Sequence, residues 1–147
     1  MSIVKDILAD KGRKVWTVEP RTTLLEALKE LRAHRVGALL VVEDGLVKGI
    51  ISERDFAYRI AEKETCPLEE SVSSWMTKEV IAINSNTTIE ECMQLMSREH
   101  VRHLPVVDDG RLVGLISIGD VVRAVISGQQ STISGLENYI LSQGFVN

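Results

Sequence analysis

The chain has 147 residues, a net charge of −4 and a hydrophobic fraction of 44%, which is ordinary for a globular protein. The negative charge and an aromatic content of only 4% disfavour nucleic acid or an anionic membrane as the main partner. No apolar run approaches the ~18 residues that span a bilayer, the N-terminus is not typical of a signal peptide, and two cysteines indicate neither a disulfide framework nor a thiolate zinc site, so we expect a cytoplasmic protein.

The first half of the chain predicts a β-α-β-β-α order after a short helical lead-in. Thr23 and Glu26 form a capping box at the start of a helix. Asp44-Gly45 is a favoured two-residue hairpin turn between two apolar runs. The predicted elements are the lead-in helix 3–9, strand 15–18, helix 23–34, strand 38–42, strand 47–51 and helix 52–62.

The second half predicts the same order after a polar linker over residues 63–73. Thr88 and Glu91 form the second capping box, and Asp109-Gly110 the second hairpin turn. The predicted elements are strand 80–83, helix 88–100, strand 103–107, strand 112–116 and helix 117–127.

The two halves form an internal repeat with a constant offset of 65 residues. Thr22 matches Thr87, and Asp55 matches Asp120. From Val18 onward, 13 of 39 positions are identical to the residue 65 places later, without a gap. We expect repeat 1 over residues 1–65, repeat 2 over 66–127 and a C-terminal extension over 128–147.

The C-terminal extension carries an apolar stripe of its own. A helix over residues 132–142 would place Ile133, Leu136, Tyr139 and Ile140 on one side. Such a stripe packs either on its own domain or on a neighbouring subunit, and both interpretations stay open.

Each repeat ends a strand in Ser and begins a helix whose first turn contains Asp. These segments are Ser52-Glu53-Arg54-Asp55 and Ser117-Ile118-Gly119-Asp120. A helix N-terminus attracts anions because its first backbone N–H groups are unpaired. A carboxylate beside it accepts hydrogen bonds and suits a pair of sugar hydroxyls. The pair indicates either a ribonucleotide site or a capping box with only a structural role.

These features together resemble the tandem cystathionine-β-synthase (CBS) domain pair, in its small stand-alone form. The resemblance rests on the Leu104-Pro105-Val106-Val107 run followed by Asp-Gly, and on the Gly-x-x-Ser-x-x-Asp segments at 49–55 and 114–120. It implies an α/β fold in which two β-α-β-β-α repeats pack through their sheets about a pseudo-two-fold axis. It also implies two clefts for an adenosine-containing ligand: AMP, ADP, ATP, NAD or S-adenosylmethionine.

Residue by residue, the resemblance implies three sets of contacts. The ribose would be held by Asp120 and Asp55. The phosphates would be held by Ser117, Arg102, His103, Arg54 and Ser52. The base would be held by Val80, Ile81, Pro105 and Ile118.

The two clefts are not equivalent in sequence. Arg102-His103 and Pro105 of the second repeat are replaced by Gly37-Ala38 and Leu40 in the first. Because a charge-assisted contact from Arg to phosphate is stronger than a neutral hydrogen bond, we expect the Asp120 cleft to bind more tightly. Arg54 could reach phosphates in either cleft.

Other chemistry finds less support. His100 and His103 lack a Cys or paired carboxylates to complete a metal site, so we expect no metal. Cys92 matches Ala27 and lies among predicted core positions, as an inert buried thiol does. The leading hypothesis is a non-catalytic nucleotide sensor that regulates a separate, unidentified protein. The alternatives are a structural or interaction protein that keeps the fold without nucleotide binding, and an enzyme such as a nucleotide hydrolase.

The resemblance also implies a homodimer formed through apolar helix faces. We expect these faces to contain Phe56, Ile60, Val121 and Val125. Two-fold closure is the commonest assembly among soluble oligomers.

Overall fold

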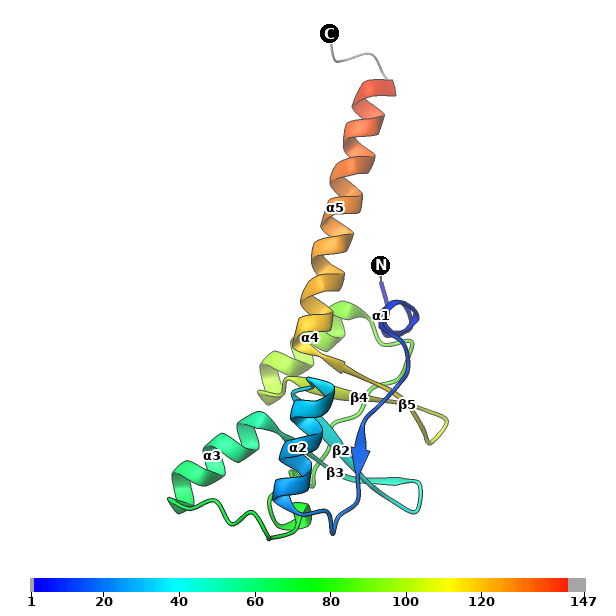
Figure 1. Cartoon of the computed structure of the whole chain (residues 1–147). Coiled ribbons are helices and arrows are strands. Elements are labelled where there is room, and N and C mark those ends of the chain that lie inside the picture. Colours follow the sequence, from blue (N-terminus) through cyan, green and yellow to red (C-terminus); the bar gives the residue numbers. More distant parts are fainter. Residues whose placement is uncertain (1, 143–147) are drawn as a thin grey trace. The chain divides into compact units, whose positions relative to one another are not determined.

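The computed structural model describes residues 2–142 of the 147-residue chain, except for the side chains of residues 130, 131, 141 and 142. The fold is α/β and contains two β-α-β-β-α repeats, as the sequence predicts, with the first strand of the second repeat reduced to a single bridge (Figure 1). In chain order the elements are α1 (Val4–Lys11), β1 (Thr17–Val18), α2 (Leu24–His34), β2 (Ala38–Glu43), β3 (Leu46–Ser52), α3 (Glu53–Lys63), the 3₁₀ helix η1 (Val72–Ser74), α4 (Ile89–Glu99), β4 (His103–Asp108), β5 (Arg111–Ser117) and α5 (Ile118–Ser142).

The first repeat builds a three-stranded sheet in the order β1-β2-β3. β1 pairs in parallel with β2, and β2 pairs with β3 in an antiparallel hairpin. The turn residues Asp44 and Gly45 have φ values of 53° and 76°, a region that glycine enters without steric cost. The predicted hairpin is therefore confirmed.

The second repeat keeps the hairpin, as β4 and β5, but the strand expected over residues 80–83 is wrong. Only Ile83 pairs, through a single parallel bridge with Val106. In the first repeat the backbone N–H of Leu40 extends the parallel pairing by donating to the Trp16 carbonyl at 3.3 Å. The equivalent residue in the second repeat is Pro105, which has no N–H to donate.

The compact units cut across the sequence repeats. One unit contains residues 14–82, and the other contains residues 1–13 together with 83–147. α1 belongs to the second of these, where Ile3 bridges Thr88. Conversely, the segment around η1 belongs to the first, where Ser71 bridges Thr23. Each compact unit thus contains the N-terminal segment of the other sequence repeat.

Glycines in the two hairpins allow these exchanged segments to lie close to the sheet. A Cβ atom at Gly49 would lie 2.6 Å from the Met76 sulfur and 2.8 Å from the Thr77 carbonyl oxygen. A Cβ atom at Gly114 would lie 2.6 Å from a methyl group of Leu8. Real Cβ atoms do not approach other atoms so closely, so at both positions a side chain would force the neighbouring atoms to move.

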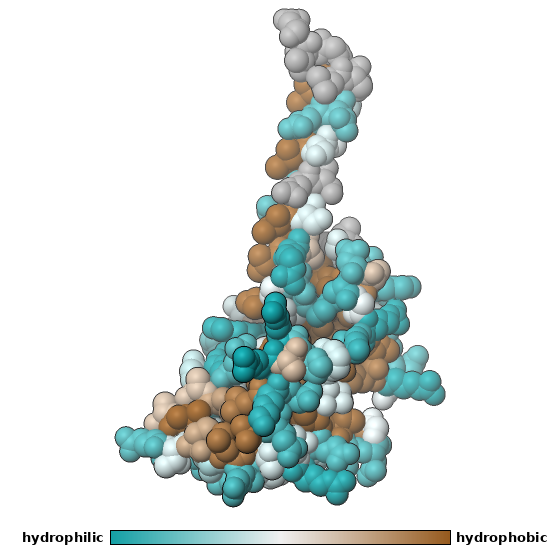
Figure 2. Space-filling model, in the orientation of Figure 1, coloured by the Kyte–Doolittle hydropathy of each residue, from teal (hydrophilic) through white to brown (hydrophobic). Residues whose placement is uncertain are grey.

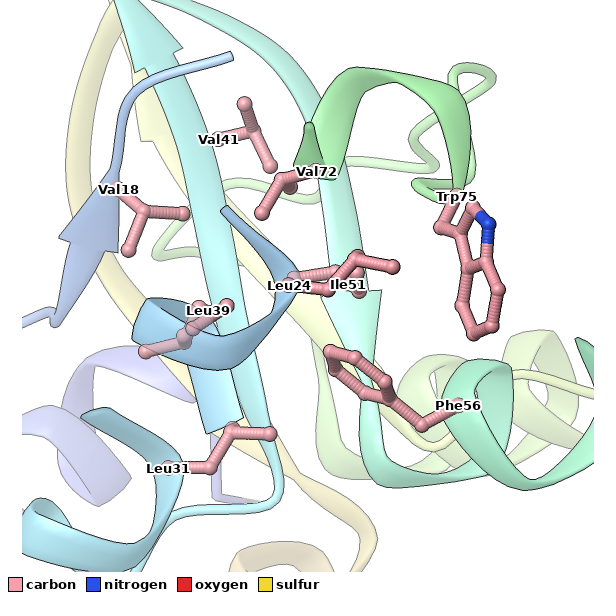
Figure 3. Close-up of a cluster of buried hydrophobic side chains, with 10 residues drawn as sticks. Val18, Leu24, Leu31, Leu39, Val41, Ile51, Phe56, Val72 and Trp75 are labelled. Carbon is pink, nitrogen blue, oxygen red and sulfur yellow. The ribbon is translucent and has the colours of Figure 1, made fainter. Parts of the chain in front are cut away.

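The unit of residues 14–82 has a continuous apolar core (Figure 3). Phe56 lies beside Trp75, with ring centroids 5.9 Å apart. Phe56 is only 4% exposed, and Val121 in the other unit is 1% exposed. The expectation that these two residues form exposed helix faces is therefore wrong. Phe56 follows Asp55 in α3 and Val121 follows Asp120 in α5, and each side chain is buried in the core of its own unit.

α5 is one continuous helix of 25 residues. The sequence predicted a helix that ends near Ser127 and a separate one over residues 132–142. Gly128 is part of the helix and does not have the positive φ that would end it, so no break separates the two segments.

Candidate functional site

Both Ser…Asp segments form reciprocal caps at the point where a hairpin strand becomes a helix. In the first repeat the backbone N–H of Ser52 donates to the Asp55 carboxylate at 2.8 Å, and the Asp55 N–H donates to the Ser52 hydroxyl at 3.2 Å. Ser117 and Asp120 repeat the two distances. The predicted caps are confirmed, and each fixes one carboxylate at a helix N-terminus. We call these the Asp55 corner and the Asp120 corner.

The Asp120 corner brings two cationic side chains onto the carboxylate. The Lys11 ammonium from α1 donates to Asp120 Oδ2 at 2.7 Å, and Arg123, one turn along α5, donates to Oδ1 at 2.6 Å. Lys11 also donates to the Leu115 carbonyl at 2.8 Å, which fixes α1 against β5.

Asp120 is only 7% exposed, and these contacts decide whether its carboxyl group is charged. Burial alone would raise the pKa of its carboxyl group. The hydrogen bonds from Lys11 and the Ser117 backbone outweigh burial and hold the pKa below its ordinary value. Asp120 is therefore a carboxylate at neutral pH, and three of its roughly four acceptor positions are in use.

A cavity of about 340 Å³ lies beside Asp120, within the same compact unit. This volume lies at the lower end of the range for small-molecule sites. α1 and α5 supply its walls. The cavity is lined by Ile7, Asp10, Lys11, Asp120, Arg123, Ala124 and Ser127.

The other predicted residues of the second repeat lie on or next to β4, the strand that pairs with β5. The Ile118 N–H donates to the Arg102 carbonyl at 2.9 Å, and His103 pairs with Ser117 across the hairpin. Pro105 is buried opposite Leu115. These residues are thus neighbours along the two strands, although none of them lines the cavity beside Asp120.

Ile118 does not line the cavity beside Asp120. Its side chain is 46% exposed and lines an apolar groove between α4 and α5, together with Met93 and Met96. Its role in base binding stays a prediction.

The Asp55 corner has the same backbone but different neighbours. The Ser52 hydroxyl also lies 3.0 Å from the Asp55 carboxylate, and the Thr77 hydroxyl reaches it at 3.4 Å. Arg54 follows Ser52 in the first turn of α3. Val80 and Ile81 belong to the same compact unit, in an irregular segment after η1, and are half-buried.

Lys11 and Arg123 are the site residues that sequence reasoning missed. Arg123 lies three residues after Asp120, so helical spacing could have indicated it. Its equivalent in the first repeat is Tyr58, and for that reason the repeat comparison gave no signal. Lys11 lies 109 residues from Asp120, and only the folded chain brings the two together.

Residues 2–142 contain no group of three or more His, Cys, Asp or Glu side chains placed to hold a metal ion. Within the same residues, no helix has the length and apolar character needed to cross a membrane.

A repeated α/β unit with a carboxylate fixed at each strand-to-helix corner defines a class of paired-repeat domains. The chain matches the CBS domain family over residues 4–62 and 72–127, and it belongs to that family. It is 36% identical to the CBS domain-containing protein YhcV of Bacillus subtilis, over 89% of this chain and 91% of the relative. The predicted family resemblance is therefore confirmed.

Solved structures agree with this assignment. The CBS-domain protein ATU1752 from Agrobacterium tumefaciens is 45% identical, with a TM-score of 0.81 over 84% of this chain and 98% of the other. A protein with CBS domains from Burkholderia ambifaria MC40-6 is 39% identical, with a TM-score of 0.82 over 87% and 96%. These relatives match along nearly their whole length, so the chain corresponds to a stand-alone CBS pair.

Proposed function

We propose that this protein is a non-catalytic module that binds an adenosine-containing ligand and regulates a separate protein. The observation that carries the proposal is the pair of Asp carboxylates, each fixed at a helix N-terminus at the end of a hairpin. Asp55 and Asp120 would accept the ribose hydroxyls, and the adjacent helix N-termini favour phosphate.

Ligand complexes of relatives support this choice of ligand class. A CBS pair of the protein MJ0100, 28% identical with a TM-score of 0.76, was solved with 5′-methylthioadenosine and S-adenosylmethionine. CBSX2, 27% identical with a TM-score of 0.71, was solved with AMP. Hypoxic Response Protein I, 26% identical with a TM-score of 0.68, was solved with two zinc ions. Adenosine is the part that the first three of these ligands share.

The Asp120 corner favours a ligand that also carries an anionic group. Lys11 and Arg123 face the cavity beside Asp120 and offer two cations there. This extends the predicted phosphate set of Ser117, Arg102 and His103, and of Ser52 and Arg54 at the other corner. The base contacts of Val80, Ile81, Pro105 and Ile118 remain part of the proposal, as does a cytoplasmic location.

Ligand binding would regulate a partner by favouring one conformation or assembly, which requires different affinities for the two states. The B. ambifaria relative, named as a candidate signal-transduction protein, is consistent with such a role. The alternative is an interaction protein that keeps the fold and binds no nucleotide.

Calorimetric titration separates the two functions. AMP, ADP, ATP, NAD, S-adenosylmethionine and 5′-methylthioadenosine are titrated into the wild type, Asp55→Asn, Asp120→Asn and the control Asp109→Asn. Asp109 lies in the exposed β4–β5 turn, so its change removes a charge away from either corner. We expect binding that one or both corner variants weaken at least tenfold and the control does not.

Two results would reject the proposal. The first is no heat of binding and no thermal shift with any ligand, since 100-fold excess over Kd stabilises by about 2.7 kcal/mol. The second is binding that neither corner variant weakens. Chromatography of the same mixtures would reveal ligand turnover and so an enzyme.

A further inference from the structure

α5 presents a long apolar stripe on the side of the helix that its own unit does not cover. Every described side chain from Thr132 to Ile140 is exposed. Ile133 is 55% exposed and Leu136 is 58% exposed. In Figure 2 the hydrophobic residues follow one side of the helix from its base upward. An apolar face of this length is covered in a stable protein.

The stripe has the spacing of a coiled-coil seam. Starting at Val122, its residues follow one another at intervals of 4, 3, 4, 3 and 4, which is the alternation of a and d positions in a heptad. The a positions are all isoleucine, and the d positions include valine and leucine. In chain order the seam is Val122, Ile126, Gln129, Ile133, Leu136 and Ile140.

At its base the seam continues into the groove between α4 and α5, which has a volume of about 450 Å³. Ile118, Val122 and Ile126 line it together with the methionines of α4. The equivalent groove of the first repeat, between α2 and α3, is charged: Glu53 replaces Ile118, and Arg32 replaces Ser97. Of these two grooves, the α4–α5 groove is therefore the one whose lining suits an apolar partner.

The helix beyond residue 127 needs such a partner to be stable. Gly128 and Gly135 lie in its interior, each costing about 1 kcal/mol relative to Ala. An isolated helix of this length is marginal in water even with better helix formers. Its stability must then come from packing of the apolar stripe.

We propose that the seam of α5 pairs with the same seam of a second copy of this chain in a parallel two-stranded coiled coil. Isoleucine at a with leucine at d favours two parallel strands. Glu137 is the only charged residue from Val125 to Ile140, so little repulsion opposes pairing of identical helices. No basic residue follows Arg123, and this disfavours an anionic membrane as the occupant.

Gln129 sets the register of the two helices. It is the one polar residue of the seam, at a d position. In a parallel in-register pair it lies opposite the partner copy of itself, where its amide can donate and accept. A register shifted by one heptad would place it against Val122 or Leu136, leaving a polar group without a partner.

Sedimentation equilibrium of full-length protein tests the pairing. The wild type should sediment at twice the 16.3 kDa chain mass. The double variant Ile133→Glu/Leu136→Glu should sediment as a single chain, with at least a hundredfold weaker association. The matched control Ser134→Glu/Asn138→Glu adds the same charges on the exposed opposite side of the helix and should stay a dimer. A single-chain wild type, a trimer or tetramer, or a seam variant that still dimerises would overturn the proposal.

Disulfide cross-linking tests the direction. Val122→Cys and Leu136→Cys, each made with Cys66→Ser, lie 14 residues or roughly 21 Å apart along the helix. A parallel pair joins identical positions, so both variants should form covalent dimers on oxidation. An antiparallel pair can join at most one of the two. Cross-linking at only one position, or at neither, would overturn the parallel arrangement.

Discussion

The Asp55 and Asp120 corners share one backbone and differ in what surrounds it. Strand register, the Ser–Asp cap and its two backbone hydrogen-bond lengths are the same in both. Yet Asp120 is buried under Lys11 and Arg123, whereas Asp55 is half-buried and accepts from neutral hydroxyl groups. A repeated sequence reproduces the frame of a site, and the residues that differ between the two repeats decide its charge.

This difference changes the expected order of affinity. From Arg102 and His103 alone, we expected the Asp120 cleft to bind more tightly. The structure shows that Lys11 and Arg123 add positive charge there, but they also occupy acceptor positions of Asp120 that a ribose would use. The Asp120 corner should therefore favour phosphorylated ligands, while the Asp55 corner should discriminate less between adenosine and AMP.

The largest effect expected is on stability at the two carboxylates. Asp120→Asn removes the negative charge and one of the two oxygen acceptors that face Lys11 and Arg123, and it should cost on the order of 2–3 kcal/mol at pH 7. Asp55→Asn keeps an amide oxygen for the Ser52 N–H and should cost less than about 1 kcal/mol. Urea unfolding measures both.

The pH dependence of this cost provides a check. Because folding lowers the pKa of Asp120, its contribution is fully present above the pKa of an unfolded Asp, about 4, and is lost as pH falls through the lower folded value. The gap in unfolding free energy between wild type and Asp120→Asn should narrow from pH 7 to pH 3. A gap that widened on acidification would contradict the ion-pair account.

A second pair of changes tests the exchanged N-terminal segments. Gly49→Ala should cost about 2 kcal/mol, because the added Cβ meets the backbone carbonyl of Thr77. Gly114→Ala should cost less, about 1 kcal/mol, because the atoms it meets are methyl groups of Leu8 that can turn away. Thermal unfolding measures the loss of stability in the two variants. Equal losses would contradict the expected difference between a backbone contact at Gly49 and a side-chain contact at Gly114.

Lys11→Met sharpens the comparison of ligands. We expect affinity for AMP at the Asp120 corner to fall about tenfold, or roughly 1.4 kcal/mol, while adenosine binding is unchanged or improved. Lys5→Met, an exposed change on the same helix, serves as the control. Calorimetric titration of both ligands measures the ratio. An equal loss for AMP and adenosine would show that Lys11 acts only by supporting the fold.

The smallest effect on stability is expected at Cys92, a buried helix position that is Ala27 in the first repeat. Cys92 occupies the position of Ala27, and burial together with the nearby Glu91 raises the pKa of its thiol to about 11. Cys92→Ala should cost about 1 kcal/mol by emptying a small buried volume, and exposed Cys66→Ala should change stability by less than about 0.5 kcal/mol. In the wild type, a thiol reagent at pH 8 should modify Cys66 at once and Cys92 only after unfolding.

The sequence by itself determined the parts of this protein that neighbouring residues encode. The hairpins follow from Asp-Gly turns, the helix starts from Ser or Thr caps, and the two carboxylates from their place in the first helical turn. The missing strand before Ile83 also follows from a single residue of the sequence, because Pro105 on the facing strand cannot donate the hydrogen bond that such a strand needs.

The tertiary structure alone decided which distant residues meet. α1 exchanges into the unit of the second repeat, and this places Lys11 on a carboxylate 109 residues away. Phe56 and Val121 proved to be core residues, and the extension proved continuous with α5. Periodicity assigns a side chain to a helix face, but which face is covered depends on packing between segments far apart in the chain.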